Sequence, residues 1–182
     1  FEKLGKTRDD AAGEAFDKIA RYLDLGYPGG PIIEKLASKG NPNAFTLPIA
    51  MKKTPYEFSF SGLKTATLDC INSLSNPLEH LPDICASFQE AVIQTLIFKS
   101  IEACKLQQVN NIVIAGGVAS NQTLISQFKQ DCDQHDIKPI VITPKLCTDN
   151  AAMIGLAATY LGNIYKLESK YITAKPNLSY AI

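Results

Sequence analysis

The stretch NNIVIAGGVASNQTLISQFKQDC, residues 110–132, decides the fold class. It begins with a short apolar run, residues 112–114, which predicts a buried strand. A pair of glycines follows, and Ser120 or Asn121 then starts a predicted helix. A strand that runs into a helix is the unit from which parallel sheets are built, so this stretch favours an α/β fold.

The rest of the chain continues this alternation. The longest predicted helix covers residues 82–107, where apolar side chains recur at helical spacing. Further helices are predicted over 6–25, 32–38 and 148–161, strands over 45–49 and 139–143, and a strand through residues 56–60 that turns helical after Ser61. We therefore predict an α/β protein with a mostly parallel sheet and flanking helices. The tail, residues 162–182, has no strong pattern.

The chain has 182 residues, 18 basic and 18 acidic side chains, and 46% apolar residues. This composition excludes general disorder and allows a domain with a sizeable core. No apolar run is long enough to span a membrane, and zero net charge argues against a large non-specific nucleic-acid surface. We expect a cytoplasmic protein, and we interpret Phe1 as the start of a processed or cut chain.

The cysteines and histidines limit the metal chemistry. The five cysteines have no CxxC spacing, which predicts reduced and mostly buried thiols rather than disulfides or a zinc site. The two histidines, His80 and His135, lie far apart in sequence and are interpreted as surface residues. A metal site that needs a close histidine pair therefore requires ligands from outside this chain.

Two predicted helix starts each have two interpretations. In IAGGVASN, residues 114–121, the glycines allow close approach of a ligand, and the helix start offers free amides to an anion or nucleotide. The structural alternative is a tight turn in which Asn121 only caps the helix. In CTDNAAM, residues 147–153, Asp149 is either a helix cap or a metal carboxylate.

The first predicted helix has an acidic face, and Thr7 or Asp9 is its expected cap. Asp10, Glu14 and Asp17 are spaced four and three residues apart, so they share that face. Such a face is either solvated or part of a binding site.

The YPGGP turn, residues 27–31, directly follows this helix. Its rigidity favours a site in which Gly29 and Gly30 are fixed against a bound ligand. Lys64, just inside the helix that follows FSFSG, either meets a phosphate or a partner or is a solvated surface lysine.

In this order and spacing, these segments resemble one protein family. The stretches TRDDAAGEAFDKIAR, YPGGPIIEKLA, FSFSGLKTA, SFQEAV, IAGGVASN and CTDNAAMIG are similar to the second half of the TsaD family, over roughly residues 3–161. TsaD proteins take part in threonylcarbamoyladenosine biosynthesis in tRNA and were formerly described as O-sialoglycoprotein endopeptidases, or glycoproteases. The sequences FSFSGLKTA and YPGGP resemble those of bacterial and organellar members.

The resemblance implies the ASKHA fold, shared by actin, heat-shock chaperones and sugar kinases, with two lobes around a nucleotide cleft. Residues 1–150 are then mainly the second lobe, and residues 151–182 are a helix and tail that return toward a first lobe. The implied transferase moves the threonylcarbamoyl group from threonylcarbamoyl-AMP to N6 of the adenosine next to the anticodon in tRNAs that read ANN codons. No general base is identified.

The resemblance also implies roles for individual residues. Six bind the threonylcarbamoyl-AMP or a related ATP- or AMP-type ligand: Asp17, Gly30, Glu34, Gly116, Gly117 and Asn121. Asp149 matches the carboxylate of an iron or zinc site, one divalent metal per subunit, whose two histidines belong to an HxxxH motif in the family's first half. Because that motif is absent here, the chain alone is expected to be inactive and to bind metal and adenylate poorly.

The implied partners are tRNA and proteins of the TsaB and TsaE type, with a homodimer left open and no membrane. Neutral charge indicates that tRNA binding relies on other lobes or partners. An alternative function is a non-catalytic scaffold or dimerisation partner, as TsaB is. The retained GGVASN and CTDN segments favour the enzyme. The older glycoprotease function lacks a nucleophile–base pair here, and a kinase or ATPase is an alternative only at the level of the fold.

Overall fold

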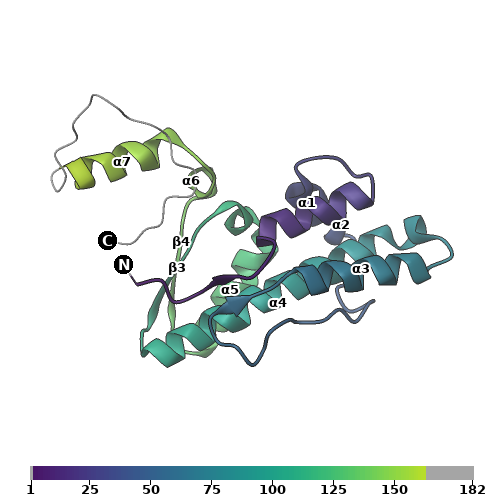
Figure 1. The fold of residues 1–182 in the computed structure, drawn as a ribbon, viewed down its shortest axis with the longest axis horizontal. Helices are drawn as coiled ribbons and strands as arrows, with labels where there is room; N and C mark the ends of the chain where they lie inside the picture. Colours follow the sequence, from purple (N-terminus) through teal and green to yellow (C-terminus); the bar gives the residue numbers. More distant parts are fainter. Residues whose placement is uncertain (1, 163–182) are drawn as a thin grey trace.

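The computed structural model describes residues 2–162 (Figure 1). The elements in chain order are β1 (Lys6–Thr7), α1 (Ala12–Tyr22), α2 (Gly29–Ala37), β2 (Glu57–Phe58), α3 (Ser61–Ser73), η1 (Pro77–His80), α4 (Leu81–Gln107), β3 (Asn111–Ile114), η2 (Gly117–Ser120), α5 (Gln122–Gln134), β4 (Lys138–Val141), α6 (Pro144–Cys147) and α7 (Ala151–Gly162). The α/β class is confirmed, and both strand pairs are parallel. They form two separate two-stranded sheets among the described residues, instead of the single sheet that the sequence suggests.

The 27-residue helix α4 is the centre of the fold, and its predicted span is confirmed to within a residue. Its first half packs with α1, α2 and α3 in one hydrophobic cluster, where the rings of Phe16 and Phe88 meet edge to face at 5.2 Å. Its second half packs with α5 in another cluster, which includes Ile97 and Phe128. One long helix therefore fixes the relative positions of the elements on both sides.

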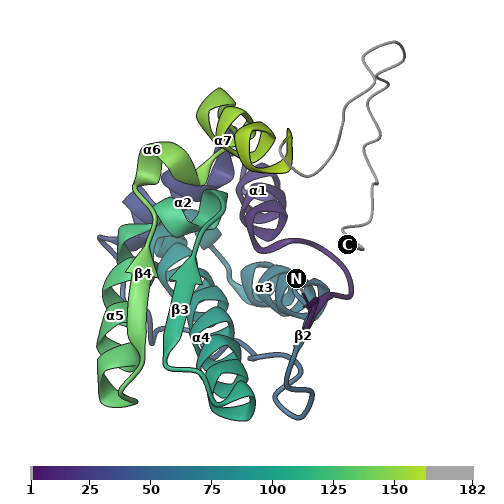
Figure 2. The ribbon, with the colours of Figure 1, turned by 90° about the vertical axis from the view of Figure 1, so that its left-hand side faces the viewer.

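The strand pair β3–β4 lies against α4 and α5 (Figure 2). Ile112 pairs with Pro139, and α5 makes the connection between the two parallel strands. Ile112 and Ile114 face the second cluster, whereas Val113 and Ile140 on the opposite face are 57% and 42% exposed. The strands predicted at 112–114 and 139–143 are confirmed as β3 and β4, with β4 ending at Val141, and of the two predicted helix starts Asn121 is the cap.

The predicted helix over 6–25 is wrong at its start. Lys6–Thr7 pairs with β2, which keeps the chain extended, and α1 begins only at Ala12. Asp9, an expected cap of α1, instead accepts hydrogen bonds from the backbone N–H groups of Phe60 and Ser61 at the start of α3. Burial alone raises the pKa of Asp9, but these bonds and one from Ser59 outweigh it and hold the pKa below its ordinary value.

Two further boundaries differ from the predictions. Helix α2 begins at Gly29, so both glycines of the YPGGP turn lie in its first turn, and the helix predicted over 32–38 starts earlier than expected. The strand predicted over 45–49 is absent. Phe45 N–H donates to Ser87 Oγ on α4 at 3.1 Å, so a helix side chain takes the place of a neighbouring strand.

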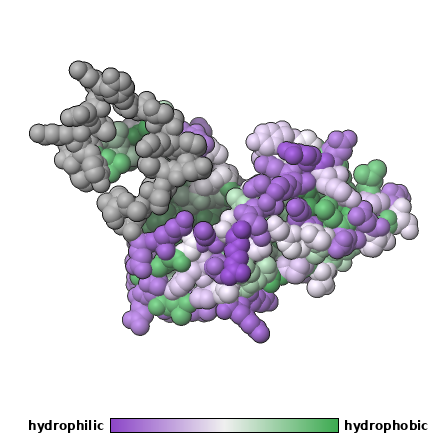
Figure 3. Space-filling model, viewed as in Figure 1, coloured by the Kyte–Doolittle hydropathy of each residue, from purple (hydrophilic) through white to green (hydrophobic). Residues whose placement is uncertain are grey.

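The C-terminal helix α7 follows the short helix α6 and extends away from the helices around α4 (Figure 1). All side chains from 151 to 161 are exposed, and hydrophobic residues are visible there beside the grey atoms in Figure 3. In residues 2–162, no helix is both long enough and apolar enough to cross a membrane. The prediction for the tail lies, from residue 163 on, outside the described residues.

The prediction of mostly buried thiols is confirmed. All five cysteines are free, and all except Cys70 are buried. Burial raises the pKa of Cys85 to about 12, so this thiol stays protonated and behaves as a small apolar side chain.

Candidate functional site

One pocket brings together the six residues predicted to bind the ligand. It has a volume of about 750 Å³ and lies between α1, α2 and the segment that joins β3 to α5. Its wall contains Asp17, Gly30, Glu34, Gly116, Gly117 and Asn121. A concave, largely apolar surface with a few polar groups is typical of a small-molecule site. The role of each residue in binding stays a prediction.

Asp17 lies on α1 and fastens that helix to α2. Its Oδ1 accepts a hydrogen bond from the N–H of Gly29, the first residue of α2, at 2.8 Å. A carboxylate at a helix start satisfies a free amide and interacts favourably with the helix dipole. Gly29 packs closely against α1, since a Cβ there would be 2.6 Å from the Cβ of Ala20. It does not line the pocket. Of the two glycines expected against a ligand, only Gly30 lines the pocket.

Glu34, on α2, connects that helix to α5. Its Oε1 accepts a hydrogen bond from the N–H of Gln122 at 2.7 Å, and Gln122 is the first residue of α5. The bond joins two helices that are distant in sequence on opposite sides of the pocket. It occupies one carboxylate oxygen and leaves Oε2 as an acceptor for a donor group such as a hydroxyl.

Asn121 is the cap of α5 and is 7% exposed. Its Oδ1 accepts from the N–H of Leu124 at 2.9 Å, and its Nδ2 donates to Oε1 of Gln89 at 2.7 Å. Gln89 lies on α4 and is 5% exposed. Asn121 is therefore confirmed as the cap of α5, and the residue also lines the pocket.

The two glycines after β3 form an open part of the pocket wall. Gly116 has a φ of +94°, a conformation that favours glycine, and it precedes the 3₁₀ turn η2. A Cβ at Gly116 or Gly117 would meet no atom within 4 Å, so the backbone here is accessible. This agrees with the predicted close approach of a ligand but does not test it.

The start of α5 is not an empty anion cradle. Its Gln122 and Leu124 amides are already paired with Glu34 and Asn121. Glu34 also places a carboxylate beside this helix start, and a phosphate there would be repelled. The sequence suggested free amides at this position, and the interaction with Glu34 was not visible because it comes from another helix.

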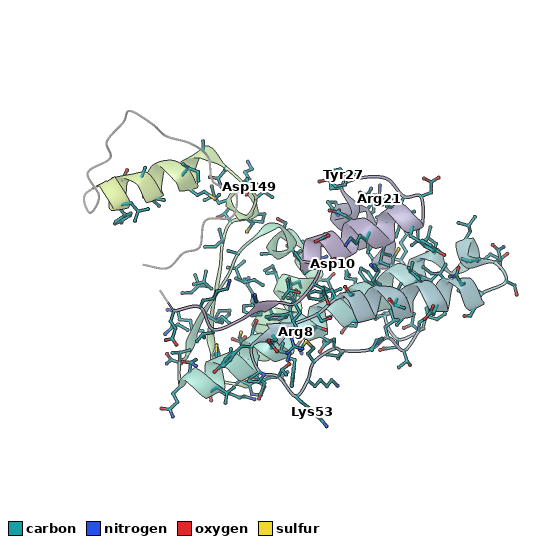
Figure 4. All side chains as sticks on the ribbon, viewed as in Figure 1. Arg8, Asp10, Arg21, Tyr27, Lys53 and Asp149 are labelled. Atoms are coloured by element: carbon teal, nitrogen blue, oxygen red, sulfur yellow. The ribbon has the colours of Figure 1, made fainter. Side chains whose placement is uncertain are left out.

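Asp149 is not among the residues that line this pocket, although its neighbour Thr148 is. It is exposed, it is absent from the pocket wall, and it sits between α6 and α7, well away from Asp10 on the approach to α1 (Figure 4). Asn150, not Asp149, caps α7, since its Oδ1 accepts from the N–H of Met153 at 2.9 Å. Across residues 2–162, no three His, Cys, Asp or Glu side chains are grouped so that they could hold a metal ion.

The three acidic residues predicted to share one face of the first helix fall into two groups, and Asp10 precedes α1. Lys18 Nζ bridges Asp10 at 2.5 Å and Glu14 at 2.8 Å, and these hydrogen bonds raise the pKa of Lys18. Lys64 Nζ lies 3.9 Å from the other oxygen of Asp10, so this lysine faces a carboxylate. Asp17 is separate from this group and is the only member of the predicted face that lines the pocket.

Two residues without a predicted role, Gln89 and Tyr27, are prominent in the structure. Gln89 was seen only as a letter of SFQEAV, although a glutamine inside the apolar stripe of a long helix is a signal of a buried polar contact. Tyr27, labelled in Figure 4, lines the pocket with 78% of its surface exposed.

Comparison with known proteins agrees with the family resemblance. The model of the TsaD family, described as tRNA N6-adenosine threonylcarbamoyltransferase, matches residues 1–156. Proteins with that name are similar to this chain in Clostridium kluyveri (49% identity over 98% of this chain and 53% of the relative), in Clostridium perfringens strain SM101 (48%, 98% and 53%) and in Staphylococcus carnosus (45%, 88% and 48%). The chain spans about half the length of the curated relatives it matches.

Proposed function

The chain belongs to the TsaD family of tRNA N6-adenosine threonylcarbamoyltransferases, and we propose that it is the C-terminal, ligand-binding portion of such an enzyme. The observation that carries the proposal is the single pocket of about 750 Å³ whose wall contains all six predicted ligand residues. We propose that this pocket binds the threonylcarbamoyl-AMP, or an ATP- or AMP-type ligand in its place.

The pocket wall supports separate roles for its polar groups. The carboxylates of Asp17 and Glu34 each use one oxygen to hold a helix start, and the other oxygen can accept a hydrogen bond from a ligand hydroxyl. The ribose of an adenylate has such hydroxyls. Gly30, Gly116 and Gly117 leave open space beside the backbone, where a planar or bulky group can approach closely.

In the proposed reaction the N6 amine of the tRNA adenosine attacks the carbamoyl carbon of threonylcarbamoyl-AMP. The new C–N bond forms as the bond from that carbon to the phosphate oxygen breaks. AMP leaves with the bonding electron pair, and the amine loses a proton. This chain's contribution is to hold and orient the adenylate, since no side chain of the pocket is assigned as general base.

We also propose that the complete protein binds an iron or zinc ion, as the family resemblance implies. Asp149 supplies one exposed carboxylate, and within residues 2–162 it belongs to no group of three or more His, Cys, Asp or Glu side chains that could hold a metal ion. Residues 2–162 therefore do not fit a three-ligand catalytic metal site by themselves, and no step is assigned to a metal. We propose that the remaining ligands come from the half of the relatives that this chain does not span.

We further propose that residues 1–150 are the second lobe of an ASKHA fold and that residues 151–182 return toward another lobe. The apolar side chains on α7, which are exposed here, support this division. The proposed partners are tRNA and proteins of the TsaB and TsaE type, with a homodimer as an alternative. Because the chain carries no net charge, we attribute most tRNA affinity to those other parts.

The test is transfer by the complete natural protein that contains this chain, with partner proteins, ATP, threonine, bicarbonate and a tRNA that reads ANN codons. Mass spectrometry of the digested tRNA should show threonylcarbamoyl on adenosine. Gly30→Leu should fill the pocket and abolish transfer, whereas Gly62→Leu should not, because both glycines have open space and only Gly30 lines the pocket. Folded wild-type protein that modifies no tRNA, or equal activity of the two variants, would contradict the proposal.

A further inference from the structure

The amide of Asn121 has one orientation that satisfies its buried contacts. The N–H of Leu124 is a donor, so the atom of Asn121 that faces it must be the oxygen. The nitrogen of Asn121 then faces Gln89, and the atom of Gln89 that meets it at 2.7 Å must be the oxygen. A backbone donor on α5 thereby determines the direction of both side-chain amides.

These two bonds use only part of the hydrogen-bonding capacity of the Asn121 amide, and the rest is available to a ligand in the pocket. An asparagine amide has two N–H donors and one oxygen with two lone pairs. One N–H is taken by Gln89, and one lone pair is taken by Leu124. The amide nitrogen of Asn121 can still offer its second N–H, and Asn121 lines the pocket with 7% of its surface exposed.

The ionisable side chains in the pocket wall have the opposite hydrogen-bonding preference. Asp17 and Glu34 present carboxylate oxygens, which accept hydrogen bonds and repel acceptor groups. A ligand that satisfies both sides must therefore turn its hydroxyls toward α1 and α2. A neutral carbonyl oxygen of the ligand must turn toward the Asn121 amide at the start of α5, because the Glu34 carboxylate beside it would repel a phosphate.

We propose that Gln89 is a positioning residue, which holds the Asn121 nitrogen so that its free N–H recognises an acceptor oxygen of the acyl-adenylate. The inference rests on the proposed function for the identity of the ligand. Gln89 does not touch the ligand in this arrangement and acts only through Asn121. Without an acceptor at position 89, the Asn121 side-chain amide is no longer held in place. Water then competes with the ligand for its N–H groups.

The experiment measures binding of a non-hydrolysable threonylcarbamoyl-adenylate analogue to the complete natural protein by calorimetry. Gln89→Leu keeps the volume but removes the acceptor, and it should weaken binding about tenfold, as expected for one lost hydrogen bond. Gln89→Glu keeps an acceptor oxygen whether or not the carboxyl is protonated, and it should bind within about threefold of wild type. The contrast between these two variants separates positioning from a general effect of mutating α4.

Asn121→Asp is the matched test of the donor. Aspartate caps helices as well as asparagine does, so the thermal midpoint should stay close to that of wild type. Gln89 can rotate its amide and donate to the new carboxylate, so the buried contact is also kept. Binding of the analogue should nevertheless fall at least tenfold, because the N–H is replaced by a second acceptor oxygen.

Wild-type affinity in Gln89→Leu or in Asn121→Asp would overturn the inference. If wild type itself does not bind the analogue, the proposed function fails, and the ligand-free protein decides the inference separately. NMR should then show two distinct, slowly exchanging Asn121 side-chain amide protons in wild type and faster exchange in Gln89→Leu. Identical exchange in the two proteins would refute the positioning role.

Discussion

The helices α4 and α7 are both rich in apolar residues, but their surroundings are opposite. Helix α4 buries 14 of its 27 residues and belongs to both hydrophobic clusters. Helix α7 contains no charged residue, yet its side chains from 151 to 161 are all exposed, with Ile154 and Leu156 exposed at 63% and 61%. A helix that is apolar on all sides is typical of a buried element.

The difference distinguishes the helices that bury their apolar side chains within this chain from a helix whose apolar side chains stay exposed. The helices α1 to α5 enclose their own apolar side chains, so their stability should depend on internal packing. The apolar surface of α7 has no such enclosure within residues 2–162, and it agrees with the proposal that this segment returns toward another lobe. The predictions below test that contrast, from the largest expected change in unfolding free energy to the smallest.

Removal of a ring at the centre of α4 should have the largest effect. Phe88 is fully buried against Phe16, and Phe88→Ala should lower the unfolding free energy by about 3 to 5 kcal/mol, measured by chemical denaturation. Phe98, on the same helix and 38% exposed, provides the control, and Phe98→Ala should cost well under half as much. Equal losses would mean that α4 is not the centre of the core.

Two adjacent glycines provide the second comparison. Gly29→Ala should lower the unfolding free energy by about 1 to 3 kcal/mol, because its Cβ would overlap Ala20 and the backbone of α1. Gly30→Ala should stay within about 1 kcal/mol of wild type, since its Cβ would enter open space and alanine favours a helix. Denaturation curves of the two variants measure the difference, and a destabilised Gly30→Ala with a normal Gly29→Ala would reverse it.

The sequence predicts best those elements that depend on local signals. The apolar stripe of α4 and the cap at Asn121 are visible within a few residues, and both are confirmed. The pair β1–β2 joins Lys6 to Glu57, and nothing near Lys6 signals that pairing. Helical spacing after Lys6 therefore extended the predicted α1 too far, and the same long-range contact moved Asp9 from α1 to α3.

The candidate site also combines residues that the sequence predicts with long-range contacts that it does not reveal. The residue types in GGVASN and around Asp17 suggested ligand contacts, and the family resemblance selected six residues that the structure gathers in one pocket. The contacts of Glu34 with Gln122 and of Asn121 with Gln89 link separate helices, so no spacing in the sequence reveals them. Asp149 lies outside this pocket wall.

The cap at the start of α3 should have a moderate, pH-dependent effect. Asp9→Asn should lower the unfolding free energy at pH 7 by about 1 kcal/mol, because its carboxylate accepts bonds from Phe60 and Ser61. The pKa of Asp9 is lower in the folded state, so its stabilisation is complete above the unfolded value of about 4 and is lost as the pH falls through the folded value. Denaturation at pH 7 and pH 3 should show the gap between wild type and variant closing at the lower pH.

The smallest change in stability should come from α7. Because Ile154 and Leu156 are exposed, the double variant Ile154→Ser, Leu156→Ser should alter the unfolding free energy of this chain by less than about 0.5 kcal/mol. The same variant should bind less of a dye specific for exposed apolar surface, and in the complete natural protein it should lower the thermal midpoint, because there the two side chains would be covered. A large loss in the 182-residue chain would show that α7 packs on its own lobe, whereas no loss in either protein would show that its apolar side chains stay in water. Only loss confined to the complete protein agrees with the division of the chain at residue 150.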